Sequence, residues 1–255
     1  MIKSTVKDGV AEVLLDAPPV NGLTEALLNQ LMQVLSQVGN DKSVRAIVLG
    51  SAIPGRFCGG LDLPQFLKST PTDVHTIVGK LYYHLYELQS SLPKPVIAAI
   101  SGAVRGGGMS IAITCDMIVA AEDATFGYPE LEVGLLPAIH FTHLPRIVGK
   151  PRAFDLLFTG RVFNAREAED LGLVGRVVKT DEVLAEAHRL ARVFAGKSPE
   201  LMRLGKAAFV RATDNGYRQG AASAVDLVST VFGTVDGQEG LKAFAEKRKP
   251  KWRDA

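Results

Sequence analysis

Residues 94–116, KPVIAAISGAVRGGGMSIAITCD, constrain the fold of this chain more than any other stretch. The apolar run at 96–100 predicts a buried strand, and the small, mostly apolar residues at 109–115 predict a buried helix. Three glycines at 106–108 lie between them. A helix that begins at glycines leaves free backbone N–H groups, which a ligand oxygen can approach closely. Since the helix dipole adds partial positive charge there, we expect a site for an oxyanion.

Several common functions are excluded by pattern and composition. The glycines match neither GxxxxGK[ST] nor GxGxxG, so we reject a phosphate-cradling loop and a dinucleotide fingerprint. A net charge of +2 argues against nucleic acid as the main partner. No apolar run approaches the roughly 18 residues of a membrane span, and no signal core opens the chain. Cys58 and Cys115 lack metal-site spacing, so we expect free thiols, no metal and a cytoplasmic location.

The order of predicted elements indicates two regions. Strand patterns alternate with helix patterns as far as residue 181, with a polar loop at 51–60 and a long helix at 72–89. After residue 181 only helical patterns follow. We therefore predict an α/β core over residues 1–195 and a helical region over 196–255. The predicted strands are 5–6, 10–15, 44–49, 96–100, 117–121, 124–126 and 174–178.

Four segments, taken in order, resemble the crotonase or enoyl-CoA hydratase/isomerase superfamily. FCGGLDL at 57–63 is similar to its FCAGADL signature, and KPVIAAISG with GGG at 94–108 is similar to its central KPVIAAVNG…GGG segment. FGYPELEVGL at 126–135 resembles FGxPE…xGL, and EGLKAFAEKRK at 239–249 resembles EGMxAFxEKRK. The gaps agree as well as the residues, and the resemblance covers essentially the whole chain.

This resemblance implies a fold, an assembly and a substrate class. The implied fold is the crotonase/ClpP-like spiral of ββα units, with residues 196–255 forming a helical C-terminal trimerisation region. The implied assembly is a homotrimer or a dimer of trimers. The implied substrate is an acyl-CoA thioester, and no separate cofactor is needed because coenzyme A is part of the substrate.

The resemblance also assigns catalytic positions. The backbone N–H groups of Leu61 and Gly107 match the two donors that hold the thioester oxygen while an enolate forms. Glu130 matches a glutamate that moves the proton. Its apolar neighbours in 126–135 are expected to raise the pKa of its carboxyl and make it a better base at neutral pH.

One departure from the family pattern bears on the reaction. Hydratases have a second glutamate where this chain has Ser110. A single carboxylate fits an enoyl-CoA isomerase-type reaction better than a standard two-glutamate hydratase, because moving a double bond needs one base. Serine at this position also occurs in the hydroxycinnamoyl-CoA hydratase-lyase branch, which is the nearest alternative. Ser110 itself is expected to hold a water or a substrate hydroxyl, or simply to be tolerated in the helix.

Further residues are expected to contact the substrate. Val20, Asp62 and Leu63 fall where family members line the coenzyme A cleft. The resemblance assigns coenzyme A contacts to Phe244 and Lys247, reaching a neighbouring subunit's ligand. Without it, the basic residues 247–249 would be interpreted as a solvated tail.

Two residues leave their roles open. His140 stands in a loop, 135–143, that is bulkier than its family counterpart, and it is either a second proton carrier or a packed, hydrogen-bonded histidine. Arg105 replaces the usual aliphatic residue before the glycines, and it either pairs with a carboxylate or contacts the ligand.

Two other classes of protein compete with an acyl-CoA enzyme. A non-catalytic acyl-CoA binding protein would keep the cleft without the second glutamate. A serine hydrolase is the other, although the sequence around Ser110 lacks the second glycine of GxSxG.

Overall fold

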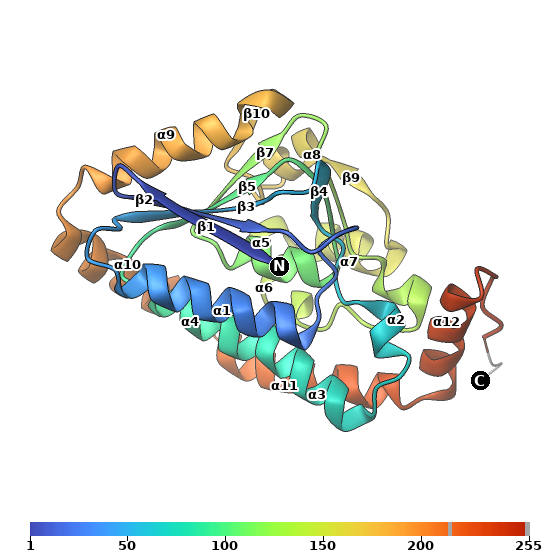
Figure 1. Cartoon of the computed structure of the whole chain (residues 1–255). Helices are drawn as coiled ribbons and strands as arrows, with labels where there is room; N and C mark the ends of the chain where they lie inside the picture. The colour runs from blue at the N-terminus through green and yellow to red at the C-terminus, as the bar shows by residue number, and fades with distance from the viewer. Residues whose placement is uncertain (214–215, 253–255) are drawn as a thin grey trace.

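The structure of the chain, a computed structural model, describes residues 1–213 and 216–252. Strands and helices alternate through the first two thirds of the chain, and helices alone follow (Figure 1). The strands are β1 (Ile2–Lys7), β2 (Val10–Leu15), β3 (Ala46–Ser51), β4 (Gly55–Cys58), β5 (Val96–Ile100), β6 (Gly102–Arg105), β7 (Met117–Ala121), β8 (Thr125–Gly127), β9 (Phe163–Asn164) and β10 (Arg176–Val178).

The helices fall into a set within the α/β part and a set at its end. The first set is α1 (Glu25–Asn40), α2 (Leu63–Phe66), α3 (Pro71–Gly79), α4 (Leu85–Ser91), α5 (Gly107–Ile113), α6 (His140–Val148), α7 (Lys150–Thr159) and α8 (Ala165–Asp170). The second is α9 (Val183–Ala195), α10 (Pro199–Thr213), α11 (Tyr217–Phe232) and α12 (Val235–Ala245). Single turns of other helix types are η1 (Lys80–His84), η2 (Pro129–Val133) and η3 (Thr180–Glu182).

The larger sheet has six strands in the order β1-β2-β3-β5-β7-β10. Strands β1 and β2 form an antiparallel hairpin, and β2, β3, β5, β7 and β10 run parallel. The hairpin turns at Asp8 and Gly9, which both have positive φ, the conformation that favours an Asp-Gly pair in a tight hairpin turn. Every residue of β5 is buried, which confirms the apolar strand predicted at 96–100.

A second sheet, β4-β6-β8-β9, corrects two predictions. Residues 51–60 are not all loop, because β4 lies within them, and residue 100 is followed by β6 before the chain enters α5. The two strands pair closely: a Cβ added to Gly102 would lie 2.1 Å from the Gly55 carbonyl carbon. A local pattern could not predict this pairing, because Gly102, which permits the close approach, is far from Gly55 in sequence.

The predicted helix at 72–89 forms as α3, η1 and α4, with a π-helical turn in the middle. Thr70 caps its start in a capping box with Asp73. The C-terminal helices return to this part of the chain: α11 packs on α3, and α12 packs on η2. The helical region is therefore folded against the core beside residues 129–133. Its standing as a separate domain, 196–255, stays a prediction.

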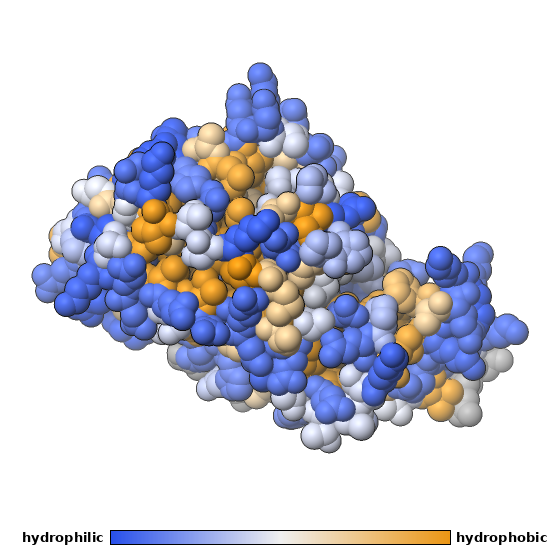
Figure 2. Space-filling model, in the orientation of Figure 1, coloured by the Kyte–Doolittle hydropathy of each residue, from blue (hydrophilic) through white to orange (hydrophobic). Residues whose placement is uncertain are grey.

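The surface of the larger sheet is partly apolar. Figure 2 shows apolar side chains gathered over the area where the strands of this sheet lie between α9 and α1 in Figure 1. Among residues 1–213 and 216–252, no helix is both long and apolar enough to cross a membrane.

Candidate active site

A cavity of about 610 Å³ lies where four segments meet: residues 59–61, residues 105–107, η2 and the segment after α12. Its wall includes residues from each of the four segments that carried the family resemblance. Those with chemistry to offer are Leu61, Arg105, Gly107, Glu130, Phe244 and Lys247. The structure thus brings together residues that are almost 190 positions apart in sequence.

The two predicted oxyanion donors lie side by side on this wall. A Cβ added to Gly107 would lie 3.7 Å from the Leu61 amide nitrogen, and one added to Gly60 would lie 3.3 Å from the Gly107 amide nitrogen. Within the described part of the chain, neither the Leu61 N–H nor the Gly107 N–H donates to another group. Gly107 is the first residue of α5, so its N–H also lies at the positive end of the helix. Two free, adjacent N–H groups suit one carbonyl oxygen.

Gly106 allows the predicted base to approach these donors. It has φ 50° and ψ −120°, a conformation that residues with a side chain rarely adopt. A Cβ at this position would lie 3.3 Å from Glu130 Oε1. Two constraints therefore favour glycine at position 106: the backbone conformation, and the close approach of the Glu130 carboxylate.

Glu130 follows Pro129 at the start of η2. Its Oε2 atom is buried and has no hydrogen-bond partner among the described residues. Burial raises the pKa of the carboxyl to about 7, and a hydrogen bond from its own backbone opposes the shift. A carboxyl with this pKa exists in both protonation states near neutral pH, so it can both accept and return a proton.

Ser110 and His140 form a buried polar pair, and neither lies on the cavity wall. Ser110 Oγ is 3.3 Å from His140 Nε2, and His140 Nδ1 is 3.2 Å from His143 Nε2. The Tyr128 ring packs edge-on against His140, with ring centroids 4.5 Å apart. Burial lowers the pKa of His140 well below its usual value and that of His143 to about 3. Both rings are therefore neutral, and of the two roles open for His140, the geometry favours the packed, hydrogen-bonded one.

Tyr128 and His143 are members of this cluster to which the sequence analysis assigned no role. The hydroxyl of Tyr128 is buried without a hydrogen-bond partner in the described residues, and burial and the Glu130 charge both raise its pKa. Tyr128 fills the variable position of the FGxPE segment, and His143 follows His140 by three residues in α6. That spacing places both rings on one helix face, which was the available signal.

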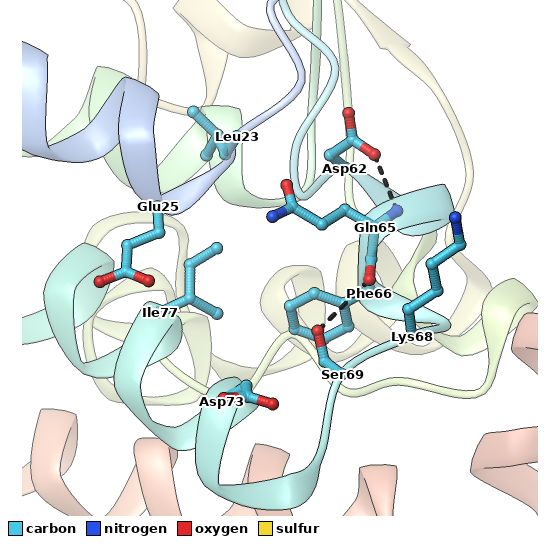
Figure 3. A pocket seen from close by; sticks show the side chains of 9 residues that line it. All are labelled: Leu23, Glu25, Asp62, Gln65, Phe66, Lys68, Ser69, Asp73 and Ile77. Carbon is cyan, nitrogen blue, oxygen red and sulfur yellow. Dashed lines mark hydrogen bonds between the residues drawn. The ribbon is translucent and has the colours of Figure 1, made fainter.

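The residues predicted to line the coenzyme A cleft lie in different places. Leu63 is on the cavity wall. Val20 is not on the wall but contacts Gly59, which is, and the Gly59 N–H donates to the Val20 carbonyl oxygen at 2.8 Å. Asp62 caps α2 by accepting from Gln65 N at 3.0 Å. It lines a separate cavity of about 280 Å³ (Figure 3). Adjacent residues 62 and 63 thus face different cavities, because the short helix α2 begins between them.

Phe244 and Lys247 belong to the wall of this chain's own cavity. We expected them to reach a neighbouring subunit's ligand, but α12 folds back on η2, which carries Glu130. The chain turns after α12 with Lys247 at φ 52°, and residues 247–250 follow along the cavity. Contact with a neighbour's ligand stays a prediction.

Arg105 lies on the wall with its guanidinium held by the protein. Nη1 donates to the carbonyl oxygens of Val104 and Thr125, each at 2.8 Å, and Nη2 donates to Thr125 Oγ1 at 3.0 Å. Burial and the nearby Arg56 lower its pKa. Two roles were left open for Arg105. Among the described residues, its guanidinium does not pair with a carboxylate. No three His, Cys, Asp or Glu side chains within those residues are placed to hold a metal ion.

Comparison with known proteins agrees with this geometry. The family model described as enoyl-CoA hydratase/isomerase matches residues 5–255. A Bacillus subtilis protein named "Probable enoyl-CoA hydratase" is 35% identical over 255 residues, which cover 99% of this chain and 98% of that protein. The mouse mitochondrial "Enoyl-CoA hydratase domain-containing protein 2" is 36% identical over 250 residues, which cover 96% and 84%.

The crystal structure of an enoyl-CoA hydratase from Mycobacterium avium subsp. paratuberculosis superimposes with a TM-score of 0.87 at 26% identity, covering 99% of this chain and 98% of the other. This chain therefore belongs to the enoyl-CoA hydratase/isomerase family of the crotonase superfamily, and it has the crotonase fold with a helical C-terminal region. It is an acyl-CoA enzyme of that family.

Proposed function

We propose that this chain catalyses a hydratase-type or isomerase-type reaction of an enoyl-CoA, with Glu130 as the single group that moves the proton. The observation that carries this proposal is the Glu130 carboxyl, raised to a pKa of about 7, on the same cavity wall as the free N–H groups of Leu61 and Gly107. A base poised near neutral pH beside two oxyanion donors is the arrangement that enolate chemistry needs.

Hydration is the first candidate, and the hydratase names of the relatives support it. As water attacks C3, its oxygen forms a bond to that carbon and its proton passes to the Glu130 carboxylate. The C2=C3 electron pair moves into a thioester enolate, whose oxygen the two N–H groups hold. Glu130 then returns the proton to C2. One carboxylate suffices, because it ends the cycle in the state in which it began.

Isomerisation is the second candidate, and the lone carboxylate supports it. Glu130 would remove a proton from C4 of a 3-enoyl-CoA and return it to C2 through the same enolate. A hydroxycinnamoyl-CoA hydratase-lyase reaction is the nearest chemical alternative, since serine at position 110 accompanies a single glutamate there too. A non-catalytic acyl-CoA binding protein remains the alternative without chemistry.

We also propose that the chain assembles as a homotrimer or a dimer of trimers and uses no cofactor beyond the substrate's coenzyme A. The support for assembly is α10, which is held on the core by Lys206 but has no residue that is buried as a whole. It leaves Leu201 and Phe209 about 70% exposed. Apolar side chains presented in this way suit contact with another copy. Sedimentation measurements would test the assembly.

The experiment that tests the reaction is a substrate panel. Wild-type protein is incubated separately with 2-enoyl-, 3-enoyl- and hydroxycinnamoyl-CoA thioesters, and products are followed by absorbance and mass. Hydration predicts a gain of one water from a 2-enoyl-CoA, and isomerisation predicts a 2-enoyl product from a 3-enoyl-CoA at unchanged mass. Binding of every thioester with turnover of none would reject both reactions in favour of the binding protein.

A further inference from the structure

The loop between β2 and α1 lies beside Leu61, and the proton transfer assigned to Glu130 makes no use of it. Its residues 20–23 form a run of hydrogen bonds with residues 57–62, the segment that contains Leu61. Donor first, the bonds are Asn21 Nδ2 to Phe57 O (2.8 Å), Cys58 Sγ to Asn21 O (3.2 Å), Gly59 N to Val20 O (2.8 Å), Leu23 N to Gly60 O (2.7 Å) and Asp62 N to Leu23 O (3.1 Å). Leu61 alone within 57–62 makes none of these bonds to residues 20–23.

This run of bonds determines which way the Leu61 N–H points. Leu23 and Leu61 pair as a short parallel bridge, in which Leu23 bonds to the residues on either side of Leu61. Because backbone groups of successive residues alternate between the two sides of such a segment, the Leu61 N–H faces away from residues 20–23. Gly107 lies on that other side, with its Cβ position 3.7 Å from the Leu61 nitrogen and 3.0 Å from Leu23 Cδ1. Residues 20–23 therefore direct the Leu61 N–H to the wall that it shares with Gly107.

Asn21 anchors residues 20–23 from a fully buried position. Its Oδ1 accepts from Ala17 N, and its Nδ2 donates to Ser51 Oγ and to Phe57 O, each at 2.8 Å. A backbone N–H only donates and a backbone C=O only accepts, so Ala17 and Phe57 fix which way the amide faces. Its own N–H donates to Ala17 O, and its C=O accepts from Cys58. Every polar group of Asn21 thus has a partner, as a buried group requires.

Two requirements select asparagine at position 21. The backbone there has φ 54°, a left-handed conformation that asparagine and aspartate tolerate better than most residues with a side chain. The side chain must also present one acceptor and two donors from a single planar group close to the backbone. Aspartate has the right length but lacks the donors, and glutamine has the donors but is one carbon too long. The three segments that end at Ala17, Ser51 and Phe57 are thereby joined through one residue.

We propose that Asn21 is a positioning residue for the reaction: by anchoring residues 20–23, it holds residues 57–62 so that the Leu61 N–H points to the thioester oxygen. This inference rests on the oxyanion role of Leu61 in the proposed function, and Asn21 itself moves no proton. A donor that is aimed before the substrate arrives needs no reorganisation during the reaction. Misplacement of a reacting group by about 1 Å can lower a rate roughly 100-fold, so a distant anchor can matter for catalysis.

The carbonyl stretching band of a bound thioester tests the inference without turnover, because hydrogen bonds to the oxygen lower its frequency. Butyryl-CoA labelled with carbon-13 at the carbonyl carbon is bound at saturation, so a change in Kd does not affect the band, and infrared difference spectra isolate it. We expect the wild type to lower the frequency relative to the free thioester. Asn21→Gly tolerates φ 54° but removes the side-chain bonds, so it should lose most of that shift. Its kcat should fall roughly 10- to 100-fold.

Two further variants separate positioning from a loss of stability. Asn21→Asp keeps the shape of the side chain and the bond from Ala17, but at pH 8 its carboxylate cannot donate to Phe57. It should also lose most of the shift, and it decides the matter if Asn21→Gly does not fold. Asn164→Ala is the matched control: Asn164 Oδ1 accepts from Glu167 N at 2.9 Å and caps α8. Loss of this cap should lower the melting temperature and leave the carbonyl band and kcat unchanged.

The outcomes distinguish the inference from the function on which it rests. A folded Asn21→Gly or Asn21→Asp protein with the full wild-type shift would overturn the inference, and so would an equal loss of the shift in Asn164→Ala. A wild type that binds butyryl-CoA without any shift would reject the oxyanion role of Leu61 and Gly107 itself, and the inference with it. Failure of the Glu130 assignment would be seen separately, as undiminished turnover in Glu130→Gln.

Discussion

Glu130 lies against Gly106, with its Oε1 atom 3.3 Å from the point where a Cβ on Gly106 would be. We predict that Gly106→Ala lowers kcat at least tenfold, because the methyl group displaces the carboxylate and the backbone conformation at φ 50° is strained. Gly149→Ala is the control, since Gly149 has φ 83° and no atom within 4 Å of its Cβ position. It should carry the backbone strain alone, with a lower melting temperature and an unchanged kcat. Equal losses of kcat in the two variants would contradict the prediction.

The N–H of Gly107 is predicted to hold the thioester oxygen. Gly107→Pro removes that N–H at the first position of α5, where helices tolerate proline, so we expect kcat to fall about 100- to 1,000-fold in a folded protein. Gly107→Ala keeps the N–H; its Cβ would lie 3.0 Å from the flexible side-chain ends of Leu23 and Leu81, and 3.7 Å from the Leu61 amide nitrogen, which is an ordinary van der Waals distance. Steady-state kinetics of the three proteins decide the matter. If Gly107→Ala lost as much activity as Gly107→Pro, the side chain and not the N–H would be responsible.

Leu61 tests the other donor through its side chain. Leu61→Ala keeps the backbone N–H and enlarges the cavity wall, so we expect turnover to persist and chain-length preference to shift toward longer acyl groups. The measurement is kcat/KM over a series of acyl-CoA chain lengths. Complete loss of activity in a folded Leu61→Ala protein would count against a backbone role.

The pKa of Glu130, about 7 in the folded protein against 4.5 for an unperturbed glutamate, gives two pH dependences. Where Glu130 acts as a base in the free enzyme, kcat/KM should rise with pH and level off above about 7. The stability of the fold depends on pH with the opposite sign. Below pH 4.5 the carboxyl is protonated in both the folded and the unfolded state, so it does not change the free energy of unfolding. Between pH 4.5 and 7 the unfolded chain ionises first, so stability is lost as pH rises and the loss is complete above pH 7.

Glu130→Gln should abolish this part of the pH dependence of stability. The free energies of unfolding of the two proteins are measured in urea at pH 4, 6 and 8. The difference, variant minus wild type, should increase as pH rises. A difference that does not change with pH would show that the carboxyl has an ordinary pKa.

The expected role of Lys247 in binding coenzyme A phosphates is a surface electrostatic effect. Lys247→Ala should raise the Kd of an acyl-CoA by up to about fivefold, with little effect on the pantetheine thioester of the same acyl group, which lacks the nucleotide phosphates. Lys251→Ala is the control, because Lys251 is not on the cavity wall. An unchanged Kd in Lys247→Ala, or an equal change in Lys251→Ala, would contradict the role.

The residues of the candidate site were recognisable from sequence where their expected role depends on backbone and local motif, and the roles themselves stay predictions. Leu61, Gly107 and Glu130 belong to contiguous segments with recognisable spacing, and the strand at 96–100 and the helix after the glycines follow from local apolar patterns. The structure brings these residues to one cavity, as expected. The trimer and the location of the protein in the cell stay predictions.

The remainder depends on contacts between distant residues, which no local pattern contains. Strands β4 and β6 pair because Gly55 meets Gly102, forty-seven positions away. Ser110 lies 3.3 Å from the ring of His140, thirty residues later in the sequence. Phe244 lies at its own chain's cavity because α12 packs on η2. The amphipathic pattern of α12 does not specify which part of the protein the helix packs against.

The central claim is that Glu130 moves a proton at C2 of a thioester whose oxygen is held by two backbone N–H groups. Exchange of the C2 hydrogens of butyryl-CoA in heavy water, followed by proton nuclear magnetic resonance, measures that step without any later chemistry. We predict measurable exchange with the wild type, and a rate about 100- to 10,000-fold lower with Glu130→Gln at unchanged butyryl-CoA affinity. Equal exchange rates in the two proteins, or no exchange with a wild type that binds butyryl-CoA, would contradict the claim.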